Sequence, residues 1–495
     1  MLRSTRIFLA ALCFSGFLLL FLDVSGTLPP YLAFLGKVQI VPALLAATLS
    51  GSLAVILTLV GLTLLLGRVY CSTLCPFGVM QDVISRCRGK RRFQYRPGKT
   101  ALRVVVLAVF VASLLAGVPL VFGLLEPYSA FGRVATELLL PVVNLGNNAL
   151  AFAAQKMDSV AVAPGPVVQK GLSALFGAVL TLGIAGWLAW SRGRTWCNTL
   201  CPVGTALGFL GRFALVRPRI HTEKCTECGR CAAACKASCI NTATGSLDAS
   251  RCVACFNCQG KCRHDALSFM PFRKPKDAAV RSAAPTPSTG PDLSRRAAMA
   301  GVLAGLAAVP AHATHRIKDA VIPALTRKER PARTVPITPP GSVGLRYFTA
   351  RCTGCQLCVS ACPNQVLRAI DSGTGMLQPT LSFEHGFCRM NCVACAAVCP
   401  TGAIRSITVE EKTAIQIGRV FVKPELCIVN TDEVVCTACA RACAPGAIAM
   451  AEKGERKVPA VDNERCTGCG ACEYVCPARP FAAIRVEGNV EHRRI

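Results

Sequence analysis

The chain has 495 residues, enough for about three folding units at roughly 150 residues each. Charged residues make up 17% of it, against roughly 25% in ordinary soluble proteins, which argues against both a disordered chain and a plain soluble enzyme. The formal net charge is +28, and most of the excess lies in residues 1–313, beside long apolar stretches. This placement favours charges that flank membrane spans over a nucleic-acid-binding face, because no basic patch interleaved with aromatic residues accompanies it.

Four uncharged stretches approach the ~20 residues that a helix needs to cross a bilayer. They cover residues 7–22, 38–67, 104–125 and 171–191. We predict four transmembrane helices at these positions. The segment between the second and third is rich in arginine and lysine and has Asp82 as its one acidic residue, so the positive-inside rule predicts that this loop, and with it both ends of the bundle, faces the cytoplasm.

The apolar part of the chain repeats itself. Residues 67–78 have the sequence GRVYCSTLCPFG and residues 193–204 the sequence GRTWCNTLCPVG. Asp23, after the first predicted span, corresponds to Glu126, after the third. We therefore predict a duplicated four-helix transmembrane domain over residues 1–215, with its two units packed about an axis along the membrane normal.

Residues 216–270 carry two cysteine runs, each spaced Cys-x2-Cys-x2-Cys-x3-Cys. In this bacterial ferredoxin pattern three close cysteines hold one [4Fe–4S] cubane and the fourth reaches across to the other. The spacing predicts one cluster on Cys225, Cys228, Cys231 and Cys262, and a second on Cys252, Cys255, Cys258 and Cys235. A zinc module is the alternative, but it is disfavoured because the chain has only six histidines.

A linker and an export signal are predicted next. Residues 271–293 are rich in lysine, alanine, proline and serine without a hydrophobic period, as linkers are. Residues 294–313 begin with Arg295 and Arg296, continue with an uncharged alanine-rich run and end in an Ala-x-Ala sequence at Ala313. This pattern predicts a twin-arginine export signal inside the chain, which could also serve as a fifth span, with an ordinary linker helix as the alternative.

Residues 314–495 carry four further cysteine runs, which predict four more [4Fe–4S] clusters in a ferredoxin-like α+β domain. The first and last runs have the standard spacing, whereas the two between them push the leading cysteine outward. Spacing alone leaves open whether the runs pair as neighbours or first with last. The sixteen cysteines are Cys352, Cys355, Cys358, Cys362, Cys388, Cys392, Cys395, Cys399, Cys427, Cys436, Cys439, Cys443, Cys466, Cys469, Cys472 and Cys476.

Seven of the 31 cysteines remain unassigned. Cys13 and Cys87 stand alone, and Cys239 is interpreted as a buried thiol. The other four are different, because two i, i+4 pairs occur in matching repeats at the cytoplasmic end of a span. Together they could hold one more cluster or a soft ion such as Cu(I), or cycle as dithiols, with helix-end packing as the alternative. These four are Cys71, Cys75, Cys197 and Cys201.

These motifs resemble a known set of proteins. The bundle with two Cys-x3-Cys-Pro motifs and a two-cluster ferredoxin resembles NapH and, more distantly, NosR and CcoG. The twin-arginine segment with four cysteine runs resembles the exported ferredoxins NapG and MauM. The chain thus resembles a NapH-like half fused to a NapG-like half, and the resemblance implies quinol dehydrogenation, with the quinone pool and a periplasmic reductase or cytochrome as partners.

If a quinol binds, we expect it at the outer membrane face. Carboxylates at span ends, Asp23 and Glu126, would accept protons, and the basic residues Lys37 and Arg133 would hold the quinone oxygens. Residues 1–220 contain no histidine, which excludes a bis-histidine haem there.

The predicted location is the bacterial cytoplasmic membrane, with the first ferredoxin domain inside and the C-terminal one in the periplasm. Two other functions use the same cofactors. One is a maturation factor that reduces a metal or a partner protein, and the other is a carrier fed by a cytoplasmic ferredoxin.

Overall fold

The computed structural model describes residues 2–23, 25–46, 50–89, 92–158, 162–165, 171–221, 223–271, 328–371, 373, 375–454 and 456–495. The predicted twin-arginine segment 294–313, and the predicted linker 271–293 apart from its first residue, lie outside the described residues.

The N-terminal half is a helical bundle built from two matching series of helices. The first series consists of α1 (Leu2–Leu22), α2 (Pro29–Leu32), α3 (Phe34–Lys37), α4 (Ile40–Leu45), α5 (Ser50–Leu66), α6 (Tyr70–Thr73) and α7 (Pro76–Cys87). The second consists of α8 (Thr100–Leu115), α9 (Pro119–Leu125), α10 (Pro127–Val134), the π-helical turn Ala135–Leu139, α11 (Leu140–Lys156), α12 (Leu172–Arg192), α13 (Thr195–Thr199) and α14 (Pro202–Gly211).

The two series interlock. Helix α7 of the first packs on α12 of the second, and α14 of the second packs on α5 of the first. Each Cys-x3-Cys-Pro motif therefore lies against a long helix of the other series.

Two helices of 21 residues, α1 and α12, are long and apolar enough to cross a membrane among the residues that the model describes. The other two predicted spans are not continuous helices. Residues 38–67 are divided between α4 and α5, and residues 104–125 between α8 and α9. The second break has a clear cause: Gly117 adopts a left-handed φ of 66°, and Pro119, which has no N–H to donate, begins a new helix. The four membrane crossings stay a prediction.

The first ferredoxin domain is small. Strand β1 (Val216–Ile220) pairs antiparallel with β4 (Leu267–Pro271), and β2 (Ile240–Asn241) pairs with β3 (Ser246–Leu247). Short helical turns, α15 (Arg230–Ala233) and Gln259–Lys261, carry parts of the two cysteine runs.

The C-terminal domain is a larger version of the same arrangement. Its strands form three antiparallel pairs: β5 (Leu367–Ala369) with β6 (Pro379–Leu381), β7 (Ile415–Val422) with β10 (Ile484–Arg494), and β8 (Ile448–Lys453) with β9 (Arg456–Val461). Its helices are α18 (Leu345–Arg351), α19 (Leu357–Ser360), α20 (Ala394–Val398), α21 (Val409–Thr413), α22 (Ile428–Thr431), α23 (Ala438–Arg441) and α24 (Ala471–Val475), with a 3-10 turn at Pro424–Leu426.

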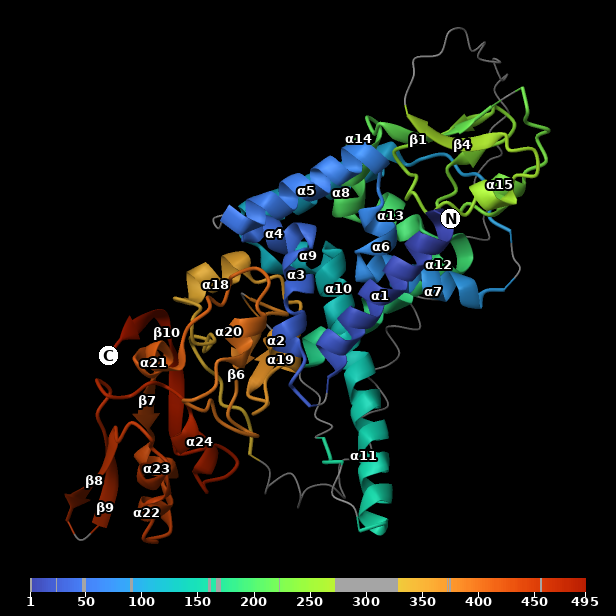
Figure 1. Ribbon diagram of the computed structural model, residues 1–495. Helices are drawn as coiled ribbons and strands as arrows, with labels where there is room; N and C mark the ends of the chain where they lie inside the picture. Colours follow the sequence, from blue (N-terminus) through green and yellow to red (C-terminus); the bar gives the residue numbers. More distant parts are fainter. Residues whose placement is uncertain are drawn as a thin grey trace, which may run out of the picture.

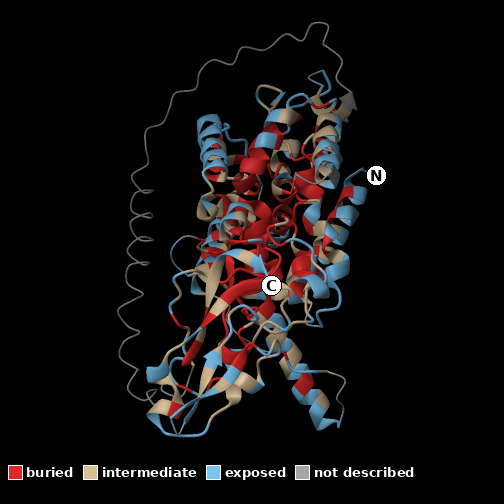
Figure 2. Ribbon diagram, turned by 90° about the vertical axis from the view of Figure 1, so that its left-hand side faces the viewer, coloured by how far each residue is buried: buried red, intermediate tan, exposed pale blue. Residues whose placement is uncertain are grey.

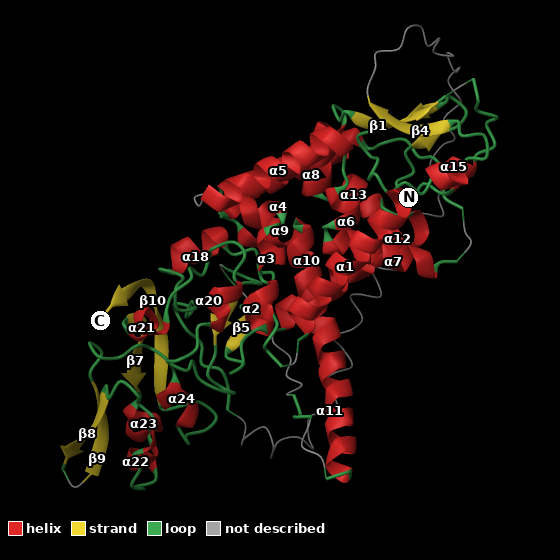
Figure 3. Ribbon diagram, viewed as in Figure 1, coloured by secondary structure: helices red, strands yellow, loops and turns green. Residues whose placement is uncertain are grey.

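The two ferredoxin domains lie at opposite ends of the bundle (Figures 1 and 3). Helix α1 runs between them: its residue Arg6 contacts Ser72 near the first domain, and its other end contacts α2 and α19 near the second. At 1.5 Å per residue, α1 is about 30 Å long. One buried core continues from the bundle into the C-terminal domain (Figure 2), so that domain is packed against the bundle.

Candidate iron–sulfur centres and their surroundings

The structure gathers the cysteines of the first ferredoxin domain into the two sets that their spacing predicts. Cys225, Cys228, Cys231 and Cys262 line one cavity. Cys235, Cys252, Cys255 and Cys258 line another. Glu227 and Ala254, which lie between cysteines of the two runs, adopt left-handed backbone conformations, with φ of 52° and 48°. These sets fit the donor groups that a [4Fe–4S] cubane requires.

The four C-terminal runs pair as neighbours, which spacing left open. The pKa of the Cys355 thiol is raised to about 12, chiefly by burial and also by the thiol of Cys399, from the next run. Burial also raises the pKa of Cys395, and its neighbours Cys388 and Cys362 add to the rise. The first two runs therefore exchange their fourth cysteines.

The last two runs exchange their fourth cysteines in the same way. Cys443 lies in a cavity with Cys466, Cys469 and Cys472, and Cys476 lies in a cavity with Cys427, Cys436 and Cys439. Among the described residues, no three His, Cys, Asp or Glu side chains are close enough to hold a single metal ion.

Cys239 is buried, as predicted, and its position is informative. Its sulfur lies 3.5 Å from that of Cys235, and it lines the same cavity as Cys252, Cys255 and Cys258. A fifth thiol therefore stands beside the second cysteine set of this domain.

The four cysteines of the repeats converge inside the bundle. Cys71, Cys75, Cys197 and Cys201 are all buried. Burial raises the pKa of Cys201 well above its usual range, and the neighbouring sulfurs of Cys197, Cys71 and Cys75 raise it further. We call these four residues the thiol quartet. Its members come equally from the two repeats.

One expectation about this motif is wrong. Cys71 and Cys75 do not occupy one helix: Cys71 lies on α6, and Cys75 is the extended N-cap residue of α7, with Pro76 as the first helical residue. The residue before a proline is driven out of the helical region, which breaks the helix. The same break separates Cys197 on α13 from Cys201, whose sulfur accepts a hydrogen bond from the Gly204 N–H.

Two arginines surround the quartet, and the interpretation of the sequence missed them. Arg68 and Arg194 hold the same position in the two repeats, three residues before the first cysteine, and both are fully buried. Arg68 Nη2 donates to the carbonyl oxygen of Cys197 at 3.1 Å, and Arg194 Nη1 donates to that of Cys71 at 2.5 Å. The signal in the sequence is the Gly-Arg pair that begins both matching segments, at residues 67–68 and 193–194.

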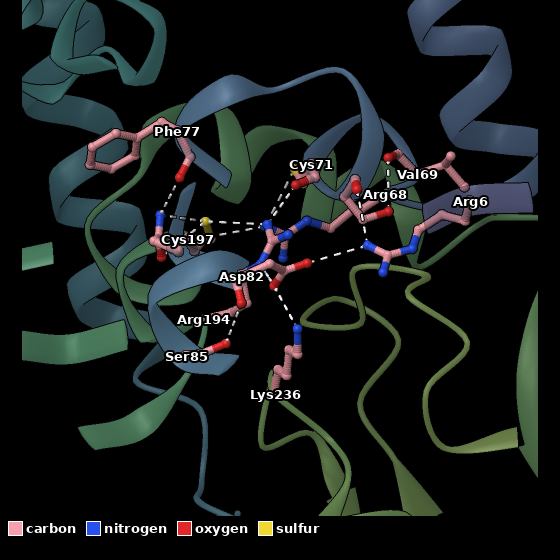
Figure 4. Close-up of polar contacts among 12 residues, drawn as sticks. Arg6, Arg68, Val69, Cys71, Phe77, Asp82, Ser85, Arg194, Cys197 and Lys236 are labelled. Atoms are coloured by element: carbon pink, nitrogen blue, oxygen red, sulfur yellow. Dashed lines mark hydrogen bonds and ion pairs between the residues drawn. The ribbon is translucent and has the colours of Figure 1, made fainter. Parts of the chain in front are cut away.

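Asp82 on α7 collects three cations next to the quartet (Figure 4). Its carboxylate accepts from Arg194 Nε at 2.8 Å, from Arg6 Nη1 at 3.2 Å and lies 3.3 Å from Lys236 Nζ. Burial alone would raise the pKa of Asp82, but these cations hold it well below its usual range. Since Lys236 belongs to the first ferredoxin domain, this ion network also fixes that domain to the bundle.

The opposite end of the bundle holds a second buried polar group. Glu126 caps α10 and accepts hydrogen bonds from the backbone N–H groups of Tyr128, at 3.0 Å, and Ser129. Burial raises its pKa, although these hydrogen bonds and Arg133 oppose the rise. Burial lowers the pKa of Arg133 to about 10, opposed by Glu126 and by Cys355 of the C-terminal domain.

The other two residues predicted for quinone chemistry lie in different surroundings. Asp23 accepts hydrogen bonds from Ser25 and from the Leu28 N–H in the turn after α1. Lys37 is exposed at the end of α3. The structure thus brings Glu126 and Arg133 together in a buried site, and leaves Asp23 and Lys37 as turn and surface residues.

Two family models match the chain. A "4Fe-4S binding domain" matches residues 49–94 and 173–222, which contain the two Cys-x3-Cys-Pro motifs, and a "4Fe-4S dicluster domain" matches residues 351–428 and 434–479. No solved structure matches.

Several curated proteins are similar to parts of the chain. The methylamine utilization ferredoxin-type protein MauM of Methylobacillus flagellatus is 33% identical over 33% of this chain and 72% of its own length. The ferredoxin-type protein NapG of Escherichia coli is 32% identical over 31% of this chain and 72% of its own length. The methylamine utilization ferredoxin-type protein MauN of Paracoccus denitrificans is 30% identical over 43% of this chain and 62% of its own length.

Proposed function

Because the chain belongs to the family of the ferredoxin-type proteins MauM and NapG, whose members are iron–sulfur proteins, we propose that it carries electrons from membrane quinol to periplasmic redox partners. The proposed activity is that of a quinol dehydrogenase. Its electron acceptor is a periplasmic reductase or cytochrome.

One observation carries this proposal: the buried pair Glu126 and Arg133 lies where the bundle meets the cysteines of the C-terminal domain. Arg133 is fully buried, and none of its three guanidinium nitrogens has a hydrogen-bond partner within the described residues. An unpaired buried donor costs about 1–3 kcal/mol, and more when it is charged. A buried guanidinium without a hydrogen-bond acceptor can bind a ligand through an oxygen atom. A quinone oxygen is an acceptor of this kind.

The neighbouring groups suit quinol oxidation. Tyr128 is fully buried, its hydroxyl also has no hydrogen-bond partner in the described part of the chain, and burial together with Cys355 raises its pKa well above the usual range. A quinol held by Arg133 would release two protons in succession to the Glu126 carboxylate, whose raised pKa favours protonation, and from there to the outer water. Its two electrons would pass singly to the neighbouring centre.

That neighbouring centre is the one we assign to Cys352, Cys355, Cys358 and Cys399. The bundle is in direct contact with it, because an added Cβ at Gly132 on α10 would overlap the carbonyl oxygen of Cys355. A [4Fe–4S] cluster held by these thiolates would supply one-electron transfer. The residues of this chain supply the thiolates, the proton acceptor and the quinone-binding cation.

We propose six clusters in the two ferredoxin domains. The second C-terminal cluster would be held by Cys362, Cys388, Cys392 and Cys395, the third by Cys443, Cys466, Cys469 and Cys472, and the fourth by Cys427, Cys436, Cys439 and Cys476. The two clusters of the first domain keep the ligands predicted above. Six cubanes correspond to about 24 iron atoms per chain, which metal analysis of anaerobically purified protein would measure.

The proposed topology is a multi-pass protein with four spans, the first ferredoxin domain in the cytoplasm and the C-terminal domain in the periplasm. Two features support it. The two domains lie at opposite ends of the bundle, and the segment rich in arginine and lysine between the second and third predicted spans contacts the first one, where Arg251 donates to the carbonyl of Arg96 at 2.7 Å.

The test is anaerobic reduction of the purified protein by a short-chain quinol. The rate of reduction is measured as the loss of visible absorbance of the clusters. We expect Glu126→Gln to slow reduction at least tenfold, because the proton acceptor is lost, while dithionite still reduces all clusters. Glu452→Gln, at an exposed carboxylate on β8, serves as the matched control. Equal rates in wild type and Glu126→Gln would remove this carboxylate from the mechanism.

A second function is favoured by the contacts at the inner end, where the first ferredoxin domain adjoins the thiol quartet through Lys236 and Asp82. Electrons could enter there from a cytoplasmic ferredoxin. The direction of electron transfer through the protein would then be the reverse of that in quinol oxidation. Reduction of the clusters by a reduced ferredoxin, in protein that quinol fails to reduce, would establish this function instead. Copper recovered with the purified protein would favour a maturation role.

A further inference from the structure

We infer that the thiol quartet holds one additional iron–sulfur cluster shared by both repeats, with Arg68 and Arg194 as its positioning residues. Arg68 is also a positioning residue of the neighbouring centre, which is formed by Cys235, Cys252, Cys255 and Cys258. The two centres would exchange electrons directly. This inference rests on the proposed iron–sulfur electron transfer, but it is independent of quinol as the donor.

The first step of the argument is the shape of the donor set. Cys71 and Cys197 lie close together, because Arg68 contacts the sulfur of Cys71 and the carbonyl of Cys197, and Arg194 contacts the sulfur of Cys197 and the carbonyl of Cys71. Cys75 and Cys201 begin the next helices of the two repeats and are also buried. Four buried thiols from two repeats are the donor set that one cubane requires. Each repeat supplies two thiols, so neither repeat could complete the site alone.

The second step concerns the charge of such a cluster. Four thiolates and a cubane carry net negative charge, which is costly in a buried site unless cations lie nearby. Arg68 Nη2 lies 3.9 Å from the sulfur of Cys71, and Arg194 Nη1 lies 3.9 Å from the sulfur of Cys197. Each arginine also donates to the other repeat's first cysteine, as described above. The two guanidinium groups thus hold the quartet together and neutralise it.

The third step is a difference between the two arginines. Arg194 is paired with the carboxylate of Asp82. Arg68 contacts no carboxylate within the described residues, because its acceptors are the Asn198 side-chain oxygen at 2.8 Å and the carbonyl oxygens of Ser250 and Cys197. The guanidinium of Arg68 therefore lies beside the quartet without a carboxylate partner in the described structure.

The fourth step connects Arg68 to the next centre. Its Nη1 donates to the Ser250 carbonyl at 3.1 Å, two residues before Cys252. Arg194 contacts the same domain, since its backbone N–H donates to the carbonyl of Lys236 at 2.8 Å. Both positioning residues are shared between the bundle and the first ferredoxin domain.

The proposed step is a one-electron transfer in which one [4Fe–4S] centre is oxidised from the 1+ to the 2+ state and the other is reduced from 2+ to 1+. No bond forms or breaks and no proton moves. A cation beside both centres stabilises the reduced, more negative state of each.

The first experiment counts iron. Anaerobically purified protein with Cys71→Ser and Cys197→Ser should contain about four fewer iron atoms than wild type, about 24 instead of 28. Its Mössbauer spectrum should lose one of seven cluster components. An unchanged iron content and spectrum would overturn the inference, whatever the outcome of the quinol assay.

The second experiment measures potentials by EPR-monitored titration. In Arg68→Gln, we expect the midpoint potentials of both the quartet centre and the Cys252 centre to fall, and Arg68→Lys to restore most of the shift. Arg103→Gln is the matched control, because Arg103 donates to the same Ser250 residue and has no hydrogen bond to the quartet in the described structure. Equal shifts of the quartet centre in Arg68→Gln and Arg103→Gln would mean that Arg68 only docks the ferredoxin domain, and would refute its role at the quartet.

Discussion

The guanidinium of Arg194 and the carboxylate of Asp82 meet at 2.8 Å, with side-chain exposures of 1% and 11%. Because Arg6 and Lys236 share the same carboxylate, removing its charge leaves three cations without an acidic partner. Breaking a buried ion pair from one side costs about 3–5 kcal/mol. We expect Asp82→Asn to lower the free energy of unfolding by about this amount, measured by denaturation of the detergent-solubilised protein.

The control for this variant is Asp248→Asn. Asp248 pairs with Arg251 at 2.7 Å, but its side chain is 37% exposed, and such pairs contribute about 1 kcal/mol or less. If the two variants were equally stable, the Asp82 network would have no special role in holding the first ferredoxin domain to the bundle.

The exchange of fourth cysteines between neighbouring runs predicts an unusual pattern of cluster loss. Cys399→Ser should perturb the centre of Cys352, Cys355 and Cys358, which is distant in sequence. Cys362→Ser should instead perturb the centre of Cys388, Cys392 and Cys395. Mössbauer and EPR spectra of the two variants should differ accordingly. Loss of the cluster of the variant's own run in each case would contradict the pairing.

His492 should make the C-terminal domain sensitive to mild acid. Burial lowers its pKa from 6.5 to about 4, and its Nε2 shares a hydrogen bond with Thr338 Oγ1 at 2.8 Å. The unfolded chain binds a proton more readily than the folded one, so stability is complete above pH 6.5 and is lost as the pH falls toward 4, by about 3 kcal/mol at most. His492→Gln should flatten the dependence of the melting temperature on pH between 7.5 and 5. An identical slope in the variant would exclude His492 as its source.

The proposed topology predicts the result of proteolysis. Protease added to intact spheroplasts should digest residues beyond 314 and spare the first ferredoxin domain, because the two lie at opposite ends of the bundle. Immunoblots against each domain would follow the digestion, with permeabilised cells as the control. Protection of both domains would indicate that all clusters face the cytoplasm.

The sequence predicts the cysteine sets of the first ferredoxin domain because their spacing is local. Cys225 to Cys231 and Cys252 to Cys258 are short runs whose thiols can only turn toward a common cavity. The pairing of Cys355 with Cys399 was not predictable in the same way, since it depends on how two whole runs pack. The i, i+4 spacing of Cys71 and Cys75 predicts one continuous helix, but Pro76 drives Cys75 into an extended conformation and divides the motif between two helices.

Polar contacts between residues far apart in the chain are the hardest to predict from the sequence. Arg68 and Asn198 are 130 residues apart in the chain and 2.8 Å apart in the fold. Glu126 and Arg133 were predicted together as quinone residues through the repeat, and they do meet in one buried site. Asp23 and Lys37, their counterparts in the first repeat, do not, because Asp23 binds the turn that follows it and Lys37 is exposed.

The bundle and the C-terminal domain are in direct contact at two glycines. At Gly132 the backbone of one half lies directly on the Cys355 carbonyl of the other, and at Gly36 the Pro400 side chain would lie 3.1 Å from an added Cβ. Within the described part of the chain, the contacts of this surface come from residues before 272 and after 327. A cut within residues 272–327 should therefore give two polypeptides that remain associated and purify together, as subunits of a heterodimer would.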